Sequence, residues 1–235
     1  MISIIVPAFN EALRLPPTLL LATDYLEGQE YEIIVVDDGS SDQTAEVVLK
    51  MSKLRPNIRL ISLSKNEGKG KAVRTGLNEA KFPICGFIDA DGATPIEEID
   101  KLIKALKDGA DVAIGSRALK ESEVETLIHR RALGRIFNFF VNVISVPGIS
   151  DTQCGFKFFK KDAFKKIYPF LTCDRFGFDV EILLLAQKFK LKIAEVPIRW
   201  TNIPGSKVNL LTDSTEMFLD IIRFRWMHRN VNLKN

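Results

Sequence analysis

The first half of the chain alternates short apolar runs with longer segments of mixed polarity. The apolar runs are rich in Ile and Val and cover residues 2–7, 31–36, 58–63, 83–88 and 111–114. Near-continuous runs of this kind predict buried parallel strands. The segments between them that have helical spacing are residues 18–26, 42–54, 69–80 and 96–107. Strands alternating with helices through right-handed crossovers predict a doubly wound, mostly parallel α/β sheet flanked by helices.

Local signals support the starts of two of these helices. Pro16 and Pro17 stand before the first helix, and proline is favoured at a helix start. Ser41 or Asp42 can cap the second helix with a side-chain oxygen.

The second half is less regular. Residues 132–146 are strongly apolar and aromatic, residues 155–159 and 192–197 are predicted strands, and residues 180–189 are a predicted helix. Residues 213–229 form a predicted basic amphipathic helix, whose apolar members are Met217, Phe218, Ile221, Ile222, Phe224 and Trp226. No internal repeat or low-complexity linker divides the chain, so we expect a single domain over residues 1–235.

Composition adds a charge asymmetry. Residues 1–110 hold 13 basic and 17 acidic residues, a net charge of −4, whereas residues 111–235 hold 20 and 13, a net charge of +7. The second half therefore favours an anionic partner, and on charge alone nucleic acid, phospholipid headgroups and a phosphorylated acceptor all stay open. The three cysteines show no paired spacing, which is typical of a reducing compartment. We see no signal peptide and no apolar run of membrane-spanning length, so we expect a cytoplasmic protein.

Polar residues follow the first four predicted strands. Ligands of open α/β sheets bind beyond the carboxyl ends of the strands, so these residues are expected to share one rim. The residues predicted at this rim, together with the small residues between the polar ones, are Asn10 and Glu11, then Asp37 and Asp38, then Asn66, Gly68 and Lys69, and finally Asp89, Ala90 and Asp91.

Asp89 and Asp91 are the residues most suggestive of chemistry at this rim. Two carboxylates one residue apart can both reach a hard divalent cation, and Mg²⁺ or Mn²⁺ would take its other ligands from water and a substrate's phosphates. Such a cation neutralises the charge that develops on a departing diphosphate. The alternative is a pair of solvated loop aspartates.

Gly68-Lys69-Gly70-Lys71 opens a predicted helix, and the amide groups of a helix start favour phosphate. The alternative is an ordinary helix start with solvated lysines. The Walker spacing is absent, and the first loop lacks G-x-G-x-x-G, which argues against a dinucleotide-dependent dehydrogenase.

The successive motifs resemble those of the family-2 inverting glycosyltransferases of the GT-A fold. The first-half motifs are residues 4–11, 35–42, 66–70 and 89–92. Those of the second half, residues 115–117, 151–157, 176–181 and 200–207, resemble the dolichyl-phosphate glucosyltransferase group, and the related mannosyltransferases share most of them. The Q-x-x-R-W signature of processive relatives is missing, so repeated sugar addition is not expected. The membrane helices of other members are missing too.

The resemblance implies a nucleotide-diphosphate sugar donor, a divalent metal (Mg²⁺ or Mn²⁺) at Asp89 and Asp91, and a polyprenyl-phosphate acceptor, with no nucleic acid. UDP-glucose and dolichyl phosphate are the expected substrates, and GDP-mannose or another acceptor is the alternative. Residues 1–115 would form the nucleotide-sugar half, residues 116–210 the acceptor half, and residues 211–235 a helix attached peripherally to the cytoplasmic face of a membrane.

Site roles follow from the same resemblance. The donor residues would be Pro7, Ala8, Asn10, Glu11, Asp37, Asp38, Asn66, Gly68, Lys69, Asp89, Ala90 and Asp91. The acceptor residues would be Arg117, Arg130, Arg131, Arg135 and Lys207, and those acting in catalysis Asp89, Asp91, Arg117 and Arg131. Arg suits a phosphate because its planar fork binds two oxygens. The alternative is that these arginines form a solvated face beside a core helix.

Three further residues have open roles. Asp179 and Glu181 could position sugar hydroxyls, assist catalysis, or cap a helix. Trp200 precedes a Pro-Gly loop that could close over the donor or form a simple turn.

Two other classes of protein remain. A nucleotidyltransferase would need a glycine-rich basic loop where Pro7-Ala8-Phe9-Asn10 stands. A non-catalytic membrane-binding module would leave the acidic rim unexplained.

Overall fold

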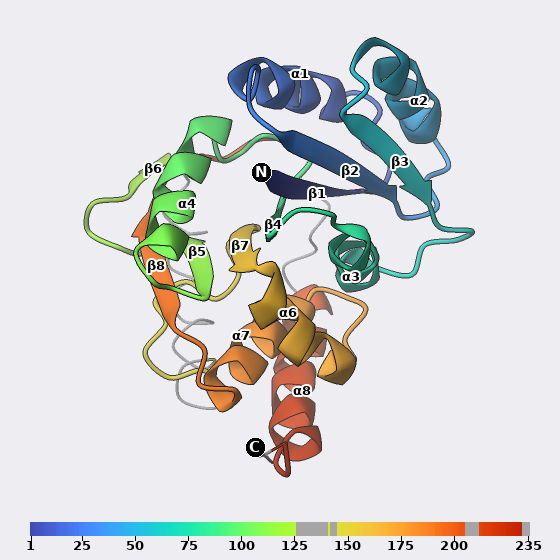
Figure 1. Ribbon diagram of the computed structural model, residues 1–235. Coiled ribbons are helices and arrows are strands. Elements are labelled where there is room, and N and C mark those ends of the chain that lie inside the picture. Colours follow the sequence, from blue (N-terminus) through green and yellow to red (C-terminus); the bar gives the residue numbers. More distant parts are fainter. Residues whose placement is uncertain (126–140, 142–144, 205–211, 232–235) are drawn as a thin grey trace.

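The computed structural model describes residues 1–125, 141, 145–204 and 212–231, with side chains of the last segment from residue 217 (Figure 1). Predictions about Arg130, Arg131, Arg135 and Lys207, and about most of the apolar segment 132–146, lie outside the described residues. None of the helices within these ranges is long and apolar enough to cross a membrane.

A seven-stranded sheet runs through the described part of the chain in the order β3-β2-β1-β4-β7-β5-β8. Its strands are β1 (Ile2–Ala8), β2 (Tyr31–Asp37), β3 (Ile58–Ser62), β4 (Ile84–Ile88), β5 (Val112–Ser116), β7 (Phe156–Lys160) and β8 (Ile193–Pro197). All neighbouring pairs are parallel except those of β7, which runs antiparallel to both β4 and β5. The predicted mostly parallel α/β sheet is therefore confirmed. A separate parallel pair joins β6 (Glu123–Glu125) to β9 (Arg199–Thr201).

Helices cover both faces of the sheet (Figure 1). On one face lie α1 (Leu15–Tyr25), α2 (Thr44–Leu54), the 3₁₀ turn η1 (Ile96–Glu98) and α4 (Ile99–Lys107). On the other lie α3 (Lys69–Glu79), α6 (Lys161–Ile167), the turn η2 (Tyr168–Phe170), α7 (Phe178–Lys188) and α8 (Thr212–Met227). Successive strand residues point to opposite faces, so Ile4 joins one core and Ile5 the other. A strand buried on both faces needs the continuous apolar run seen in the sequence.

Three helix starts differ from the sequence prediction. Helix α1 begins at Leu15, so Pro16 and Pro17 lie in its first turn rather than before it, where their missing N–H groups leave no internal bond unmade. The cap position of α2 is Gln43 without a side-chain cap, although the Asp42 carboxylate accepts the N–H of Thr44 at 3.0 Å. Helix α7 begins at Phe178, earlier than predicted.

The antiparallel strand β7 brings an extra loop to the rim. The parallel strands β1, β2, β3, β4 and β5 present their carboxyl ends there. Because β7 runs the other way, the loop that enters it, Cys154-Gly155, meets the same edge. Segments distant in sequence therefore converge on one rim.

Candidate functional site

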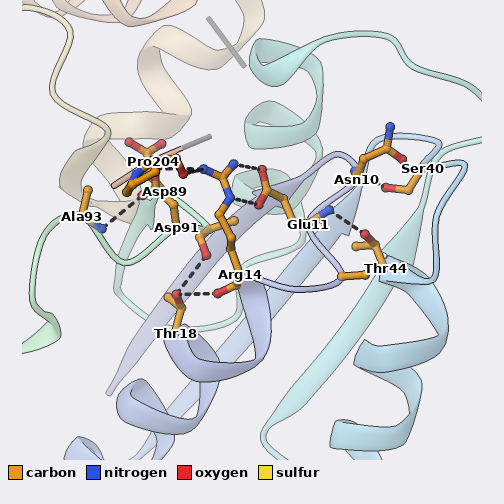
Figure 2. Close-up of polar contacts among 12 residues, drawn as sticks. Asn10, Glu11, Arg14, Thr18, Ser40, Thr44, Asp89, Asp91, Ala93 and Pro204 are labelled. Atoms are coloured by element: carbon orange, nitrogen blue, oxygen red, sulfur yellow. Dashed lines mark hydrogen bonds and ion pairs between the residues drawn. The ribbon is translucent and has the colours of Figure 1, made fainter. Parts of the chain in front are cut away.

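The loop after β1 is tied to the loop after β2 through Asn10. Its side-chain oxygen accepts the N–H groups of Ser41 (2.8 Å) and Asp42 (3.2 Å), and its own N–H donates to Ser40 Oγ (2.8 Å). Asn10 has a φ of 54°, in the left-handed region that Asn tolerates better than most residues. Next to it, the N–H of Glu11 donates to Thr44 Oγ1 (Figure 2). The amide of Asn10, which we predicted to hold the nucleoside, thus also shapes its own loop.

Asp38 organises the loop after β3. It is 3% exposed, and its two oxygens accept the N–H groups of Glu67 (2.7 Å) and Gly68 (2.8 Å). Burial raises the pKa of this carboxyl above its usual range. Its neighbour Asp37 is also buried and accepts the N–H of Ser40 at 3.2 Å. Asp38 thus fixes the loop that contains the predicted donor residue Asn66, and its backbone N–H donates to the carbonyl of Ala8, which follows Pro7 on β1, at 2.8 Å. Any effect of Asp38 on the donor therefore includes the placement of this loop.

Lys69 opens α3 and is not a free solvated lysine. Its Nζ donates to Asp89 Oδ1 at 2.6 Å. Burial disfavours the charged ammonium, but the carboxylates of Asp89 and Asp179 outweigh it and raise the pKa of Lys69. Gly68 must be glycine, because its φ is +108° and an added Cβ would lie 2.4 Å from the Asp174 carbonyl oxygen. The positive charge that we predicted for phosphate binding is therefore present on Lys69, and the ion pair with Asp89 holds it beside the acidic motif.

Asp89 and Asp91 stand at the end of β4 with 38% and 26% of their side chains exposed. Burial, and then the charge of Asp89, raises the pKa of Asp91. An Oδ1 atom of Asp91 accepts the N–H of Ala93 (3.1 Å), and the Ala90 carbonyl accepts the hydroxyl of Thr18 (2.9 Å), so this short segment is fixed (Figure 2). Gly155 leaves room for Asp89, since a Cβ there would lie 2.1 Å from Asp89 Oδ2.

This pair fits a hard divalent cation. It offers carboxylate oxygens at a partly exposed site where two like charges repel each other. Within the described residues no cluster of three or more His, Cys, Asp or Glu side chains could hold a metal by itself. Asp89 and Asp91 therefore suit a Mg²⁺ or Mn²⁺ ion that would take its remaining ligands from a phosphorylated substrate.

Arg117 follows β5 and forms an ion pair with Asp151. Its Nε and Nη2 donate to the two Asp151 oxygens (2.7 and 2.9 Å), and its backbone N–H donates to Oδ2 (2.9 Å). The guanidinium also lies 5.4 Å from the ring centroid of Trp200. Although burial alone would raise the pKa of Asp151, the Arg117 charge outweighs it and lowers that pKa. Asp151 was not predicted as a site residue from the sequence, although it lies within the motif of residues 151–157.

Asp179 and Glu181 have different surroundings. Asp179 pairs with Lys157, whose side chain is fully buried and whose Nζ also donates to the Cys154 carbonyl (2.7 Å). Neither acid caps α7, which has no side-chain cap, so that alternative is wrong: the helix starts one residue before Asp179. Glu181 accepts the N–H groups of Thr172 (2.9 Å) and Cys173 (2.8 Å) and pairs with His228 Nε2 at 2.9 Å.

Arg14 is the other rim residue that we did not predict. Its Nε and Nη2 atoms bind the Glu11 carboxylate (2.8 and 2.5 Å), and Nη1 lies 3.4 Å from the Pro204 carbonyl oxygen and 3.9 Å from Asp91 Oδ2 (Figure 2). The spacing of Glu11 and Arg14, three residues apart at a helix start, was the signal that could have found it. Lys157 had no such signal, since its partner is 22 residues away.

Comparison with known proteins bears on both fold and activity. Residues 3–168 match the family model described as Glycosyl transferase family 2. The chain is 40% identical to the dolichyl-phosphate beta-glucosyltransferase of Dictyostelium discoideum, over 97% of this chain and 74% of that protein. It is also 40% identical to the protein of the same name from Homo sapiens, over 96% of this chain and 76% of that protein.

Solved structures show the same architecture. Glucosyl-3-phosphoglycerate synthase from Mycobacterium tuberculosis superimposes with a TM-score of 0.73 at 17% identity, covering 100% of this chain and 82% of that one. A structure of that enzyme with Mn²⁺, UDP-glucose and phosphoglyceric acid gives a TM-score of 0.72 at 16% identity, covering 100% and 81%. The likeness confirms the predicted GT-A fold.

Proposed function

Because this chain belongs to glycosyl transferase family 2, and is therefore a glycosyltransferase, we propose that it transfers glucose from UDP-glucose to dolichyl phosphate with inversion at the anomeric carbon. The observation that carries this proposal is the 40% identity, over almost the whole chain, to proteins named dolichyl-phosphate beta-glucosyltransferase. The acidic rim supplies the groups that such a transfer needs.

On the donor side, Asp89 and Asp91 would hold the divalent cation. When bound, this cation neutralises the charge that develops on the departing diphosphate. Lys69 keeps Asp89 in position through its 2.6 Å ion pair and adds a positive charge beside the leaving group. Asn10 and Asp38 fix the loops against which the nucleoside would lie.

On the acceptor side, a phosphate is already ionised near neutral pH and needs no strong general base. It needs cations that hold it close to the anomeric carbon. Arg117 can do this because Asp151 fixes the plane of its guanidinium. Arg130, Arg131, Arg135 and Lys207 would add to the acceptor site. Asp179 then serves as the buried counter-ion of Lys157 beneath the rim.

Helix α8 supports peripheral attachment to a membrane. The sequence predicted one apolar stripe on this helix, which could either contact lipid or pack on the domain. In the structure some residues of the stripe are buried and others are exposed. Met217, Ile221 and Phe224 are buried against the domain, whereas Ile222 is 49% and Trp226 65% exposed. The exposed face of α8 carries Phe218, Leu219, Ile222 and Trp226 together with Arg223 and Arg225, and the exposed Arg229 follows just after the helix. A face of this composition can lie in the interface with its arginines toward anionic headgroups. We propose that this face binds the cytoplasmic surface of a membrane.

A product assay tests the proposal. The protein is incubated with Mn²⁺, a short polyprenyl phosphate and either radiolabelled UDP-glucose or radiolabelled GDP-mannose, and lipid-extractable label is measured. We expect label from UDP-glucose, and none when the phosphate-free polyprenol replaces the acceptor. Preferential transfer from GDP-mannose would replace the proposed sugar, and label from neither donor would refute the proposed reaction.

A further inference from the structure

Arg14 joins three segments of the rim at one guanidinium (Figure 2). Two of its nitrogens bind Glu11, from its own loop, and the third, Nη1, faces the Pro204 carbonyl at 3.4 Å and Asp91 Oδ2 at 3.9 Å. The hydroxyl of Thr18, one turn further along α1, bonds both the Arg14 carbonyl (3.2 Å) and the Ala90 carbonyl (2.9 Å). The start of α1 is thus fixed to the acidic motif.

The Glu11–Arg14 ion pair has no net charge, but its positive and negative charges are separated, so it forms a dipole. Glu11 occupies Nε and Nη2, so the positive end that remains, Nη1, is turned toward Asp91. Among the described residues, Arg14 is the only basic side chain within 4 Å of an Asp91 oxygen. Asp89, in contrast, is paired with Lys69 at 2.6 Å.

A positive charge in this place affects two ligands in opposite ways. It weakens the attraction of Asp91 for a divalent cation and repels that cation directly. It attracts an anion that comes between the two, and a guanidinium nitrogen makes a strong, charge-assisted hydrogen bond to a phosphate oxygen. A site in which the Arg14 guanidinium lies beside the Asp91 carboxylate is therefore suited to binding a cation and an anion together.

We propose that Arg14 belongs to the donor site, where its Nη1 binds a diphosphate oxygen of the nucleotide-sugar and opposes the binding of a divalent cation on its own. This inference rests on the proposed function for the nature of the donor. It assigns a role to a residue outside the motif residues that we chose from the sequence.

The test measures two affinities of Arg14→Gln by isothermal titration. The first is that of Mn²⁺ alone, which we expect to become tighter by about threefold or more, because a nearby positive charge is removed. The second is that of UDP in saturating Mn²⁺, which we expect to become weaker by about tenfold, as for the loss of a charge-assisted hydrogen bond. Opposite changes distinguish this role from a loss of folding, which would weaken both.

Three further variants sharpen the result. Arg14→Lys keeps the charge and should leave the Mn²⁺ affinity near that of the wild type. The double variant Glu11→Gln/Arg14→Gln removes both charges of the pair, and Mn²⁺ should still bind more tightly than in the wild type if Arg14 itself opposes the cation. Arg55→Gln is the matched control, because Arg55 is also paired with an aspartate, Asp24 at 3.0 Å, but follows the far end of α2.

The outcomes separate the two proposals. Unchanged affinities in Arg14→Gln, changes in the same direction, or a double variant that returns to the wild-type Mn²⁺ affinity would overturn the role of Arg14 while leaving the glucosyltransferase proposal intact. A wild-type protein that binds no UDP in the presence of Mn²⁺ would refute the proposed donor and this inference with it.

Discussion

Asp91 differs from Asp89, Asp151 and Asp179 in how its charge is balanced. Close basic partners hold Asp89, Asp151 and Asp179, each through a direct hydrogen bond from a lysine or arginine. For Asp91, the nearest basic atom among the described residues is 3.9 Å away. Of the two motif carboxylates, Asp91 is therefore the one whose charge a bound cation would balance most directly.

Asp91→Asn is expected to lower kcat/KM by about 10²-fold or more while the protein stays folded, because one ligand charge is lost at the metal and the diphosphate. Initial rates in saturating Mn²⁺, with circular dichroism as the check on folding, measure this. Activity close to that of the wild type would show that Asp91 is not an essential ligand.

Arg117 is expected to serve the acceptor phosphate and not the donor. Arg117→Ala should reduce transfer to polyprenyl phosphate on the order of 10²-fold, with a much smaller effect on the slow hydrolysis of UDP-glucose by water. Arg117→Lys keeps the charge but loses the two-pronged geometry, so it should also weaken transfer. Asp151→Asn should reproduce part of the loss, since Asp151 fixes the guanidinium. Equal losses in transfer and hydrolysis would place Arg117 on the donor or in folding.

Glu181 joins helix α7 to the segment between α6 and α7 and to His228, which directly follows α8. It accepts bonds from Thr172, Cys173 and His228 although its side chain is fully buried. Burial alone would raise the pKa of Glu181, but the bond to His228 and those from Thr172 and Cys173 outweigh it, so the pKa lies below its usual value. A carboxyl of this kind stabilises the fold above the pKa it has when unfolded, and the contribution is lost as the pH falls through its lower folded pKa.

Glu181→Gln is therefore expected to lower the free energy of unfolding near neutral pH by about 1–3 kcal/mol. The difference from the wild type should begin to shrink as the pH falls below about 4.3, the ordinary pKa of an unfolded glutamate, and should vanish as the pH falls through the lower folded pKa of Glu181. Urea unfolding at several pH values measures this. Glu46→Gln is the control, since Glu46 is an exposed acid paired only with Lys50 on the same helix. A difference that stays constant with pH would contradict the assignment.

The exposed face of α8 is expected to bind membranes without spanning them. Flotation with vesicles that contain phosphatidylserine should recover the protein at low salt, and Ile222→Ser/Trp226→Ser should reduce the recovery. Leu54→Ser is the control, because Leu54 is even more exposed, at 78%, but lies at the end of α2. Failure of the wild type to float at low salt would defeat peripheral attachment, and resistance to high-salt extraction would indicate deeper insertion.

Both halves of the chain contribute strands to the seven-stranded sheet. Strands β7 and β8, from the second half, lie beside β5 and β4 of the first half. The assignment of residues 1–115 to the donor and 116–210 to the acceptor stays a prediction, but both parts contribute residues to the core on each face of the sheet. Donor binding is therefore expected to stabilise the entire domain.

UDP with Mn²⁺ is expected to raise the melting temperature of the protein by roughly 5–10 °C at 100 times the Kd. This figure follows from about 2.7 kcal/mol of ligand stabilisation and from about 2–4 °C per kcal/mol for a domain of this size. Thermal unfolding with UDP, Mn²⁺, both or neither measures it. A non-catalytic membrane-binding module would show no shift with UDP.

The parallel strands, the order of strands and helices, and the polar residues of the rim follow from local pattern. An Ile- and Val-rich run needs no distant partner to indicate a strand buried on both faces, and the carboxyl ends of parallel strands must share one edge. For this reason Asn10, Asp38, Lys69 and Asp89 could be expected at one rim before the structure was known. The beginnings of α1 and α7 were displaced by a few residues, because local signals set the end of a helix only approximately.

The pairing of charges was decided by the tertiary structure. Lys157 meets Asp179, and Arg117 meets Asp151, across 22 and 34 residues. The first pair exists because antiparallel β7 inserts between β4 and β5 and carries Lys157 into the core, where a carboxylate balances its charge. The second pair exists because the segment that leads into β7 brings Asp151 to the end of β5, beside Arg117. Packing likewise divided the apolar residues of α8 into a buried and an exposed set, since the amphipathic pattern does not say which side the domain covers. Which charges meet depends on contacts between distant segments, and those contacts are set by the packing of the whole chain rather than by any local pattern.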